Sequence, residues 1–202
     1  ADERTGVGQR RSFTPMAGVE VELNSRSSAS RIAGGLGLDL IGGEAFVTVA
    51  LDDRPFEVLA GGGTVRARQA AFNVQSFADE LCVTCLTGSV VAERNGVRRT
   101  LDAGREVIFA GNGLIEEQRA DPLTRLAWRR GLLVLRRTPV TDAIAQINRY
   151  FPGRLVLTDS AKSNWPVTGT FHIDQIEVAV VQLERLLDVS ARRLPGGVVL
   201  LG

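Results

Sequence analysis

The 202-residue sequence contains little histidine, and this scarcity excludes most acid-base and nucleophilic active sites. Its one histidine, His172, lies at the predicted end of a strand, where a surface or packing role suits it better than catalysis. Any Ser-His-Asp or Cys-His arrangement would depend on this single side chain. The acidic pair Asp52-Asp53 is typical of a solvated turn, and no residues cluster as metal ligands do. We expect no enzymatic activity, no cofactor and no metal.

Cysteine is equally scarce, with only Cys82 and Cys85, which form one C-x-x-C. Positions i and i+3 of a strand point to opposite faces, so a disulfide between them would have poor geometry. A zinc site would need a second pair of ligands, which the sequence lacks. A structural role is the favoured interpretation for both cysteines, and redox chemistry and metal binding are the alternatives.

Long apolar runs and an excess of one charge are also missing. No run approaches the roughly 20 residues that a membrane helix needs. The 24 basic and 23 acidic side chains are interspersed, so the basic stripe needed for nucleic-acid binding is absent. No signal peptide is visible at the start of the sequence. We expect a soluble portion excised from a longer protein, neither embedded in a membrane nor bound to nucleic acid.

Period-two alternation dominates the first 114 residues. Val19, Val21 and Leu23 alternate with polar residues, as in a half-buried strand. About ten such runs follow one another, and Asn95-Gly96 is the strongest hairpin signal between them. We predict a β-rich domain over residues 1–114, built as a many-stranded sandwich or a solenoid-like sheet.

Glycine-rich turns are predicted to separate these strands. Gly42-Gly43 divides the run 36–41 from the run 45–49, and Thr87-Gly88 divides two later runs. Glycine suits such turns because it adopts positive φ angles at no steric cost. The glycines match neither G-x-G-x-x-G nor a P-loop, so phosphate binding is not expected.

The pattern changes after residue 114. Residues 115–127 include Glu116-Glu117-Gln118-Arg119 and Asp121-Pro122 and predict a linker or short helix, and residues 128–202 predict a small domain of two β-α-β units. The apolar residues of the two predicted helices fall at matching positions, which indicates a duplication.

Each predicted helix has a start signal. Thr138 is expected to cap the first helix, with Pro139 at its first position, where the missing N–H is harmless. Asp174 is expected to cap the second helix, and Glu177 would complete a capping box.

Several motifs occur in the order that is typical of the FecR family, which the chain resembles over nearly its whole length. They are Gly8-Gln9-Arg10-Arg11, Val21-Glu22-Leu23-Asn24-Ser25-Arg26-Ser27, Gly43-Glu44-Ala45-Phe46-Val47-Thr48-Val49, Arg54-Pro55-Phe56-Glu57-Val58, Leu101-Asp102-Ala103-Gly104 and Ala127-Trp128-Arg129-Arg130-Gly131-Leu132. Two segments depart from the family pattern, Gln69-Ala70 and Pro15-Met16-Ala17-Gly18-Val19, and both affect turns.

The resemblance implies the periplasmic region of a single-pass inner-membrane regulator, an anti-sigma factor of siderophore-dependent cell-surface signalling. It implies a FecR domain followed by a domain like the short N-terminal domain of secretins and TonB-dependent receptors. The implied partners are the signalling domain of an outer-membrane TonB-dependent siderophore receptor and a periplasmic processing protease. Their action would activate an extracytoplasmic-function sigma factor. A cell-envelope polysaccharide- or protein-binding β module without a signalling role is the alternative function.

We expect the C-terminal domain to bind the receptor through an exposed sheet edge, because an open edge can accept a strand from another chain. Apolar edge positions, a charged rim and one tryptophan are the candidates. They are Leu132, Val134, Arg136, Arg137, Trp165, Val198, Val199 and Leu200.

Overall fold

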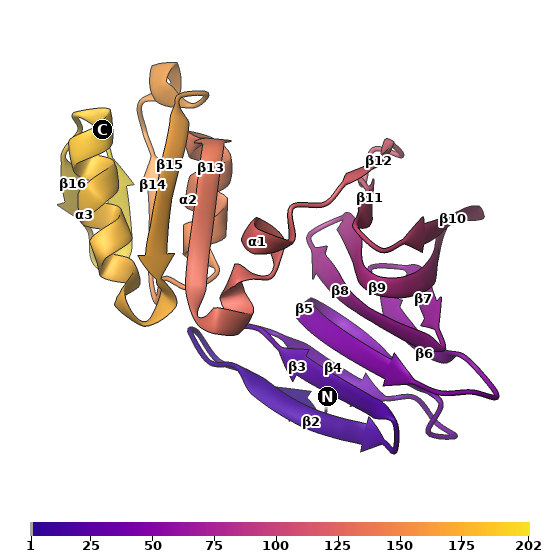
Figure 1. Ribbon diagram of the computed structural model, residues 1–202. Coiled ribbons are helices and arrows are strands. Elements are labelled where there is room, and N and C mark those ends of the chain that lie inside the picture. Colours follow the sequence, from indigo (N-terminus) through magenta and orange to yellow (C-terminus); the bar gives the residue numbers. More distant parts are fainter. Residues whose placement is uncertain (1) are drawn as a thin grey trace. The chain divides into compact units, whose positions relative to one another are not determined.

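The computed structural model describes residues 2–202 and divides into two compact units, with the division between Pro122 and Leu123 (Figure 1). We call residues up to Pro122 the β unit and residues from Leu123 the C-terminal unit. The fold is mainly β with few helices, as predicted.

The β unit contains twelve strands that form one hydrogen-bonded network. They are β1 (Glu3–Arg4), β2 (Arg11–Met16), β3 (Val19–Leu23), β4 (Ser28–Arg31), β5 (Gly37–Ala50), β6 (Phe56–Ala60), β7 (Gly63–Ala67), β8 (Gln69–Phe77), β9 (Glu80–Arg94), β10 (Val97–Asp102), β11 (Arg105–Phe109) and β12 (Ile115–Arg119). Asn95 and Gly96 both have positive φ angles and join β9 to β10, so the predicted hairpin is confirmed.

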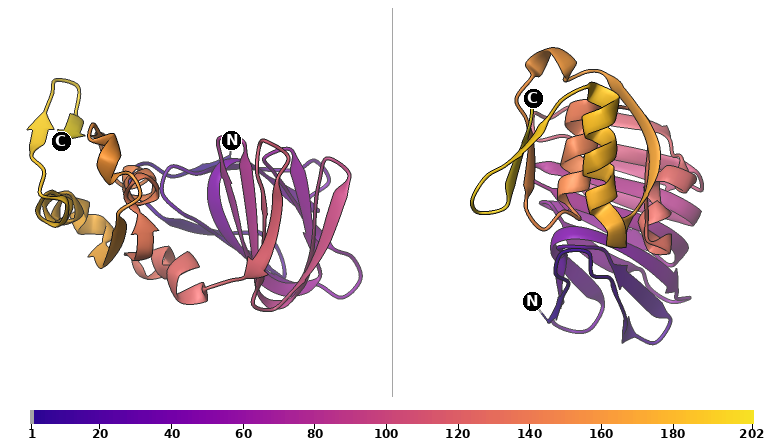
Figure 2. Two further views of the ribbon diagram at one scale, coloured as in Figure 1. Left: turned by 90° about the horizontal axis from the view of Figure 1, so that it is seen from above. Right: turned by 90° about the vertical axis from the view of Figure 1, so that its left-hand side faces the viewer.

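Two long strands, β5 and β9, take part in both faces of the β unit. The first part of β5 pairs with β4 and β6, and its last part pairs with β3 and β8. The first part of β9 pairs with β8 and β11, and its last part pairs with β7 and β10. The network therefore folds over on itself, as the view from above in Figure 2 shows. It encloses one apolar core.

The predicted turns at Gly42-Gly43 and Thr87-Gly88 are wrong, because both lie inside continuous strands. Gly43 has φ 102° and Gly88 has φ 75°, so each bends its strand without ending it. A Cβ at Gly43 would collide with Ser27, and one at Gly88 would collide with the carbonyl oxygen of Gln69. Only glycine allows both the positive φ and the close approach, and the bend carries each strand from one face to the other.

The segment 115–127 also differs from the predicted linker or short helix. Its first part is strand β12, which pairs antiparallel with β11. The short helices α1 (Pro122–Arg125) and η1 (Ala127–Arg130) follow. β12 is an edge strand with mostly exposed side chains, so it has no apolar alternation by which the sequence could reveal it.

The C-terminal unit has two sheets and two main helices. Its elements are β13 (Leu132–Pro139), α2 (Val140–Asn148), β14 (Arg154–Leu157), η2 (Ser160–Lys162), β15 (Pro166–His172), η3 (Ile173–Gln175), α3 (Ile176–Leu187), β16 (Ala191–Arg193) and β17 (Val198–Leu201). The strand-helix-strand order occurs twice along the chain before the last strand. The duplication itself stays a prediction.

The helices of the C-terminal unit lie between its sheets. β13 pairs with β15 in one sheet, and the other sheet has the order β14-β17-β16. Helix α2 contacts β13 and β15 of the first sheet and β14 of the second, and α3 contacts β15 (Figure 1). The buried faces of both helices are apolar, as their helical spacing predicted.

Both predicted helix caps are wrong. Helix α2 begins at Val140, and the Oγ1 atom of Thr138 accepts a hydrogen bond from the Arg136 amide instead of capping the helix. Asp174 lies within the 3-10 turn η3, and Glu177 forms an ion pair with Arg193 instead of a capping box. Strand pairing extends β13 through Pro139, and the extra turn η3 delays α3; neither can be read from local sequence.

Candidate protein-binding surface

Strand β13 carries four of the predicted binding residues. Leu133 and Leu135 are buried, whereas Leu132 and Val134 are half-buried. Among residues 2–202 only β15 pairs with β13, which leaves the second edge of β13 without a partner strand. The structure thus places these residues on an edge strand, and their part in binding stays a prediction.

Arg136 and Arg137 form a β-bulge in this strand. The ladder between β13 and β15 shifts register between Leu135 and Thr138, so the two arginines together lie opposite the single residue Thr168. Arg137 has φ 48°, and its amide donates to Thr168 Oγ1 at 3.0 Å. Both arginines are exposed, and a bulge of this kind projects their guanidinium groups away from the regular ladder.

The prediction that Val198, Val199 and Leu200 form a sheet edge is wrong. Their strand, β17, is the central strand of its sheet and pairs in parallel with β14 and antiparallel with β16. Val199 is buried, and both hydrogen-bonding edges of the strand are occupied. The last strand of a chain can take a central place, and local sequence does not encode that order.

Trp165 lies just before β15, at the same end of the two-stranded sheet as the arginine bulge. Its side chain is 48% exposed, and the Nζ atom of Lys162 is 5.6 Å from the ring centroid. The carbonyl of Trp165 accepts from the Val140 amide, which fixes the loop against the start of α2. The predicted tryptophan and arginine candidates therefore occupy one end of this unit.

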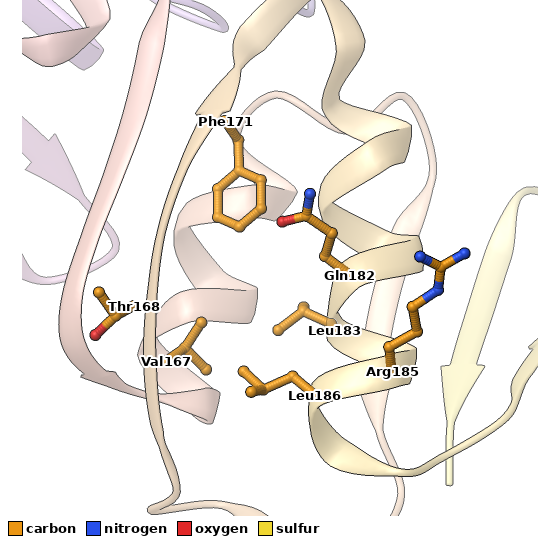
Figure 3. A pocket seen from close by; sticks show the side chains of 7 residues that line it. All are labelled: Val167, Thr168, Phe171, Gln182, Leu183, Arg185 and Leu186. Carbon is orange, nitrogen blue, oxygen red and sulfur yellow. The ribbon is translucent and has the colours of Figure 1, made fainter.

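A groove between β15 and α3 was not predicted from the sequence. Val167 and Phe171 of β15 face Leu183 and Leu186 of α3 across an apolar cavity of about 340 Å³ (Figure 3). Gln182 and Arg185 of α3 also line it. Leu186, an exposed apolar residue of α3, was the available signal. Only the packing of α3 against β15 shows that Leu186 lines a groove.

The two units carry opposite net charges. Residues 123–202 contain eleven Arg and Lys against six Asp and Glu, a net charge of +5. Residues 1–122 contain 13 Arg against 17 Asp and Glu, a net charge of −4. The near-zero total therefore hides a cationic C-terminal unit, whose field attracts acidic partners.

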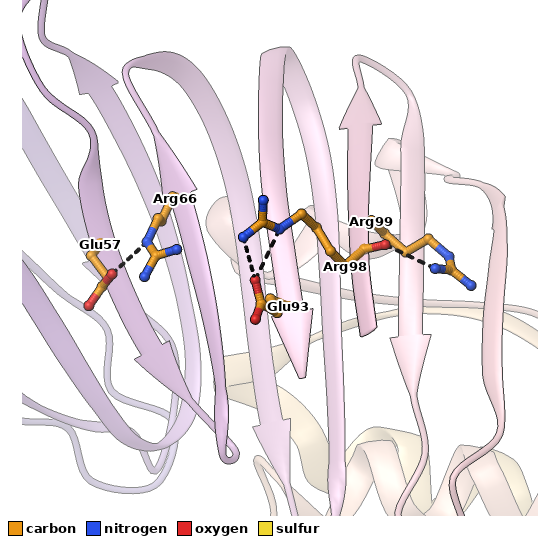
Figure 4. A network of polar contacts seen from close by, with 5 residues as sticks. All are labelled: Glu57, Arg66, Glu93, Arg98 and Arg99. Carbon is orange, nitrogen blue, oxygen red and sulfur yellow. Dashed lines mark hydrogen bonds and ion pairs between the residues drawn. The ribbon is translucent and has the colours of Figure 1, made fainter. Parts of the chain in front are cut away.

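Charged side chains on the β unit pair with each other across neighbouring strands. Arg66 of β7 pairs with Glu57 of β6 at 2.7 Å, and Arg98 of β10 contacts Glu93 of β9 through two nitrogens at 2.9 and 3.0 Å (Figure 4). Arg105 and Glu117 link β11 to β12 at 3.2 Å. Exposed pairs add little stability, but they neutralise this surface.

Two buried carboxylates form hydrogen-bond networks in the β unit. The Glu44 carboxylate accepts from Asn24 Nδ2 at 2.8 Å and from Asn73 Nδ2 at 2.7 Å. The Glu106 carboxylate accepts from Thr84 Oγ1 at 2.8 Å and from Gln118 Nε2 at 2.9 Å.

Both glutamates are only 2% exposed, so each buried oxygen depends on these donors. The sequence contains no signal that distinguishes Glu44 and Glu106 from exposed glutamates.

The remaining sequence candidates are separate from one another. Cys82 and Cys85 point to opposite faces of β9 and form no disulfide, as their spacing predicted. Burial, reinforced by the negative charge of Asp102, raises the pKa of Cys85 to about 11, so this thiol is protonated and unreactive at neutral pH. His172 is exposed at the end of β15.

Within residues 2–202, no three His, Cys, Asp or Glu side chains gather as a metal site would require. No helix over these residues has the length and apolarity needed to cross a membrane.

Comparison with known proteins agrees with this architecture. The FecR protein family model matches residues 1–91. A crystal structure of a candidate anti-sigma factor from Parabacteroides distasonis superposes with a TM-score of 0.86 at 22% identity, covering 99% of this chain and 97% of that one. A second crystal structure, also of a candidate anti-sigma factor from that organism, has a TM-score of 0.84 at 21% identity, with coverages of 98% and 96%. These structures share the fold across both units.

Among curated proteins, none matches this chain in sequence. The family match lies within the β unit and ends in β9, and the motifs from Gly8 to Val58 fall inside it. The first 91 residues therefore match the FecR protein family, and the whole chain shares the two-unit fold of the two candidate anti-sigma factors.

Proposed function

We propose that this chain is the periplasmic sensor region of a transmembrane anti-sigma regulator. In this proposal its C-terminal unit binds the signalling domain of an outer-membrane TonB-dependent siderophore receptor. Regulated proteolysis of the regulator follows, and an extracytoplasmic-function sigma factor is released. The match of residues 1–91 to the FecR protein family supports a regulatory role, as does the fold shared with two candidate anti-sigma factors.

The observation that carries the proposal is the two-stranded sheet of the C-terminal unit. β13 and β15 pair with each other and with no other strand of residues 2–202, so each keeps one open edge. A cationic bulge and an exposed tryptophan lie at one end of this sheet. Open edges and exposed aromatic and arginine side chains are typical of surfaces that bind proteins.

A relay of this kind acts by binding alone and performs no chemistry. A partner shifts the regulator between states only through different affinities for those states. The C-terminal unit would bind the partner, and the β unit would transmit the binding event toward the membrane. We further propose that the C-terminal unit corresponds to the short N-terminal domain of secretins and TonB-dependent receptors, on the basis of its strand-helix-strand order.

The polysaccharide-binding alternative receives no support from the β unit. Such a module needs a row of exposed aromatic rings, yet the phenylalanines of this unit that lie within residues 2–122 are buried or half-buried. Trp165 is the one exposed large aromatic residue in the described chain, and it belongs to the C-terminal unit.

Isothermal titration calorimetry of the full 202-residue chain with purified receptor signalling domains from the same genome tests the proposal. We expect saturable heat and co-elution in gel filtration with at least one of these domains. Absence of both heat and co-elution with every such domain would contradict the proposed function.

A further inference from the structure

The groove between β15 and α3 combines apolar walls with an open strand edge. Val167 and Phe171 form one wall, and Leu183 and Leu186 form the other (Figure 3). The lining is mainly apolar, and the cavity of about 340 Å³ has room for several side chains of a bound segment.

The backbone of β15 can pair on the side away from β13. The Ile173 amide donates to the Gly131 carbonyl at 2.9 Å, which continues the antiparallel ladder between the two strands. Bonded and non-bonded pairs alternate along such a ladder. Phe171 therefore bonds to β13, whereas Thr170 and His172 direct their N–H and C=O groups to the open edge.

Helix α3 adds an exposed apolar surface beside this edge. Val178, Val181 and Leu186 are 47%, 41% and 52% exposed, although α3 has only 12 residues. Of these three, Leu186 is the one that lies beside the open edge of β15 and belongs to the proposed binding surface. Leu186 lines the groove, whereas Val181 lies outside it, since five residues turn a helix by about 140°.

The edge strands of the β unit are protected against strand addition, and β15 is not. β10 and β12 carry exposed Arg and Glu side chains, β1 has two residues, and β2 contains Pro15. Charge, shortness and proline are the usual protections of a sheet edge. Between its first residue, Pro166, and its end, β15 contains no charged residue and no further proline.

The charges around the groove favour an acidic occupant. Arg185 lines it. Arg137 belongs to the bulge of β13, and its amide donates to Thr168, another residue of the lining. No acidic side chain in residues 2–202 forms an ion pair with Arg185 or Arg137. The net charge of +5 on residues 123–202 acts in the same direction.

We propose that this groove binds one extended segment of the receptor signalling domain, which adds to the open edge of β15 as a third strand. Its apolar side chains alternate into the groove against Leu183 and Leu186, and an acidic side chain at the rim of the groove faces Arg185. Main-chain hydrogen bonds supply affinity in this mode, and the alternate side chains supply specificity. This inference rests on the proposed function and names the surface that performs it.

Two variants of the full chain test the groove, and each has a matched control. Thr170→Pro removes an N–H from the open edge while keeping the ladder to β13, and Thr170→Val retains that N–H. Leu186→Glu places a carboxylate in the groove, and Val181→Glu places one on the same helix outside it. Calorimetry with the signalling domain should show at least about tenfold weaker binding for Thr170→Pro and Leu186→Glu, and changes below about twofold for both controls.

Hydrogen exchange of the unaltered chain provides a test that does not depend on variants. The amides of Thr170 and His172 should exchange more slowly when the signalling domain is bound, whereas those of the β13 edge should not change. Wild-type affinity in both groove variants, or no protection of these two amides, would contradict binding in the groove. The proposed function would remain intact.

Two other outcomes would also overturn the inference. If the unaltered chain binds no signalling domain, both the groove and the proposed function fail. If analytical ultracentrifugation shows a dimer that Thr170→Pro disrupts, the occupant is a second copy of this chain.

Discussion

The β unit and the C-terminal unit differ in the pairing of their charged side chains and in the protection of their sheet edges. In the β unit, arginines pair with glutamates across strands, and the edge strands are short, charged or interrupted by proline. In the C-terminal unit, the net charge is +5, β15 has an uncharged open edge, and α3 exposes apolar side chains.

We infer from this difference that the β unit serves as structural support and that the C-terminal unit carries the binding surface. A surface whose charges and edges are already satisfied offers little free energy to a partner, because binding would only exchange one set of contacts for another. The C-terminal unit retains unsatisfied edges and exposed apolar area. Changes in the β unit should therefore alter folding, and changes in the C-terminal unit should alter binding.

The largest expected effect comes from the strand bends of the β unit. Gly88 and Gly96 have φ angles of 75° and 78°, but only a Cβ at Gly88 meets other atoms. We expect Gly96→Ala to lower the free energy of unfolding by about 1 kcal/mol and Gly88→Ala by about 3 kcal/mol or more. Urea denaturation measures both values. Equal losses would show that the close approach to Gln69 is unimportant.

Buried and exposed glutamates of the β unit give the next comparison. Both oxygens of Glu44 accept hydrogen bonds, so the amide group of Glu44→Gln must face a donor, which should cost about 2 kcal/mol. Glu57→Gln breaks only the exposed pair with Arg66 and should cost less than about 0.5 kcal/mol. Thermal unfolding of the two variants checks the order, and a larger loss for Glu57→Gln would refute it.

Charge reversal should affect association only in the C-terminal unit. We expect the double variant Arg136→Glu/Arg137→Glu to slow association with the receptor signalling domain about fivefold at low salt, because the cationic rim guides the approach of an acidic partner. The matching reversal Arg98→Glu/Arg99→Glu in the β unit should leave the rate unchanged. Surface plasmon resonance measures both rates, and unchanged kinetics of the first variant would remove the rim from the mechanism.

The smallest effect concerns a thiol in the core of the β unit. The pKa of Cys85 is raised to about 11, so at pH 8 only about one thiol in a thousand is a thiolate. In a Cys82→Ala background, iodoacetamide should leave native Cys85 unmodified at pH 8, and labelling should increase as the pH rises toward 11. In urea the same thiol should react at pH 8. Rapid labelling of the native chain at pH 8, followed by mass spectrometry, would contradict its burial.

Much of the strand pattern was predictable because burial on one face leaves a clear alternation in the sequence. The hairpin at Asn95-Gly96 and the opposite orientation of Cys82 and Cys85 both follow from local geometry. The exposed strand β12 escaped prediction because it has no apolar face.

Features that depend on tertiary packing could not be predicted. Glycine with positive φ serves equally in a turn and in a bend, so the sequence around Gly43 and Gly88 could not show that their strands continue. The central position of β17 depends on which strands flank it, and the groove depends on the packing of α3 against β15. The sequence could therefore propose the C-terminal domain as the place of the candidate site, but it could not identify the groove between β15 and α3.

The two bent strands have a consequence for how the regulator can be cut. Because β5 and β9 each supply hydrogen bonds to both faces, neither face can open while the other stays intact. The β unit should therefore unfold in a single step, without a partly opened form in which a loop becomes accessible to a protease. A protease acting on the folded unit would then reach only loops that are already exposed, such as residues 52–55, and not the paired strands.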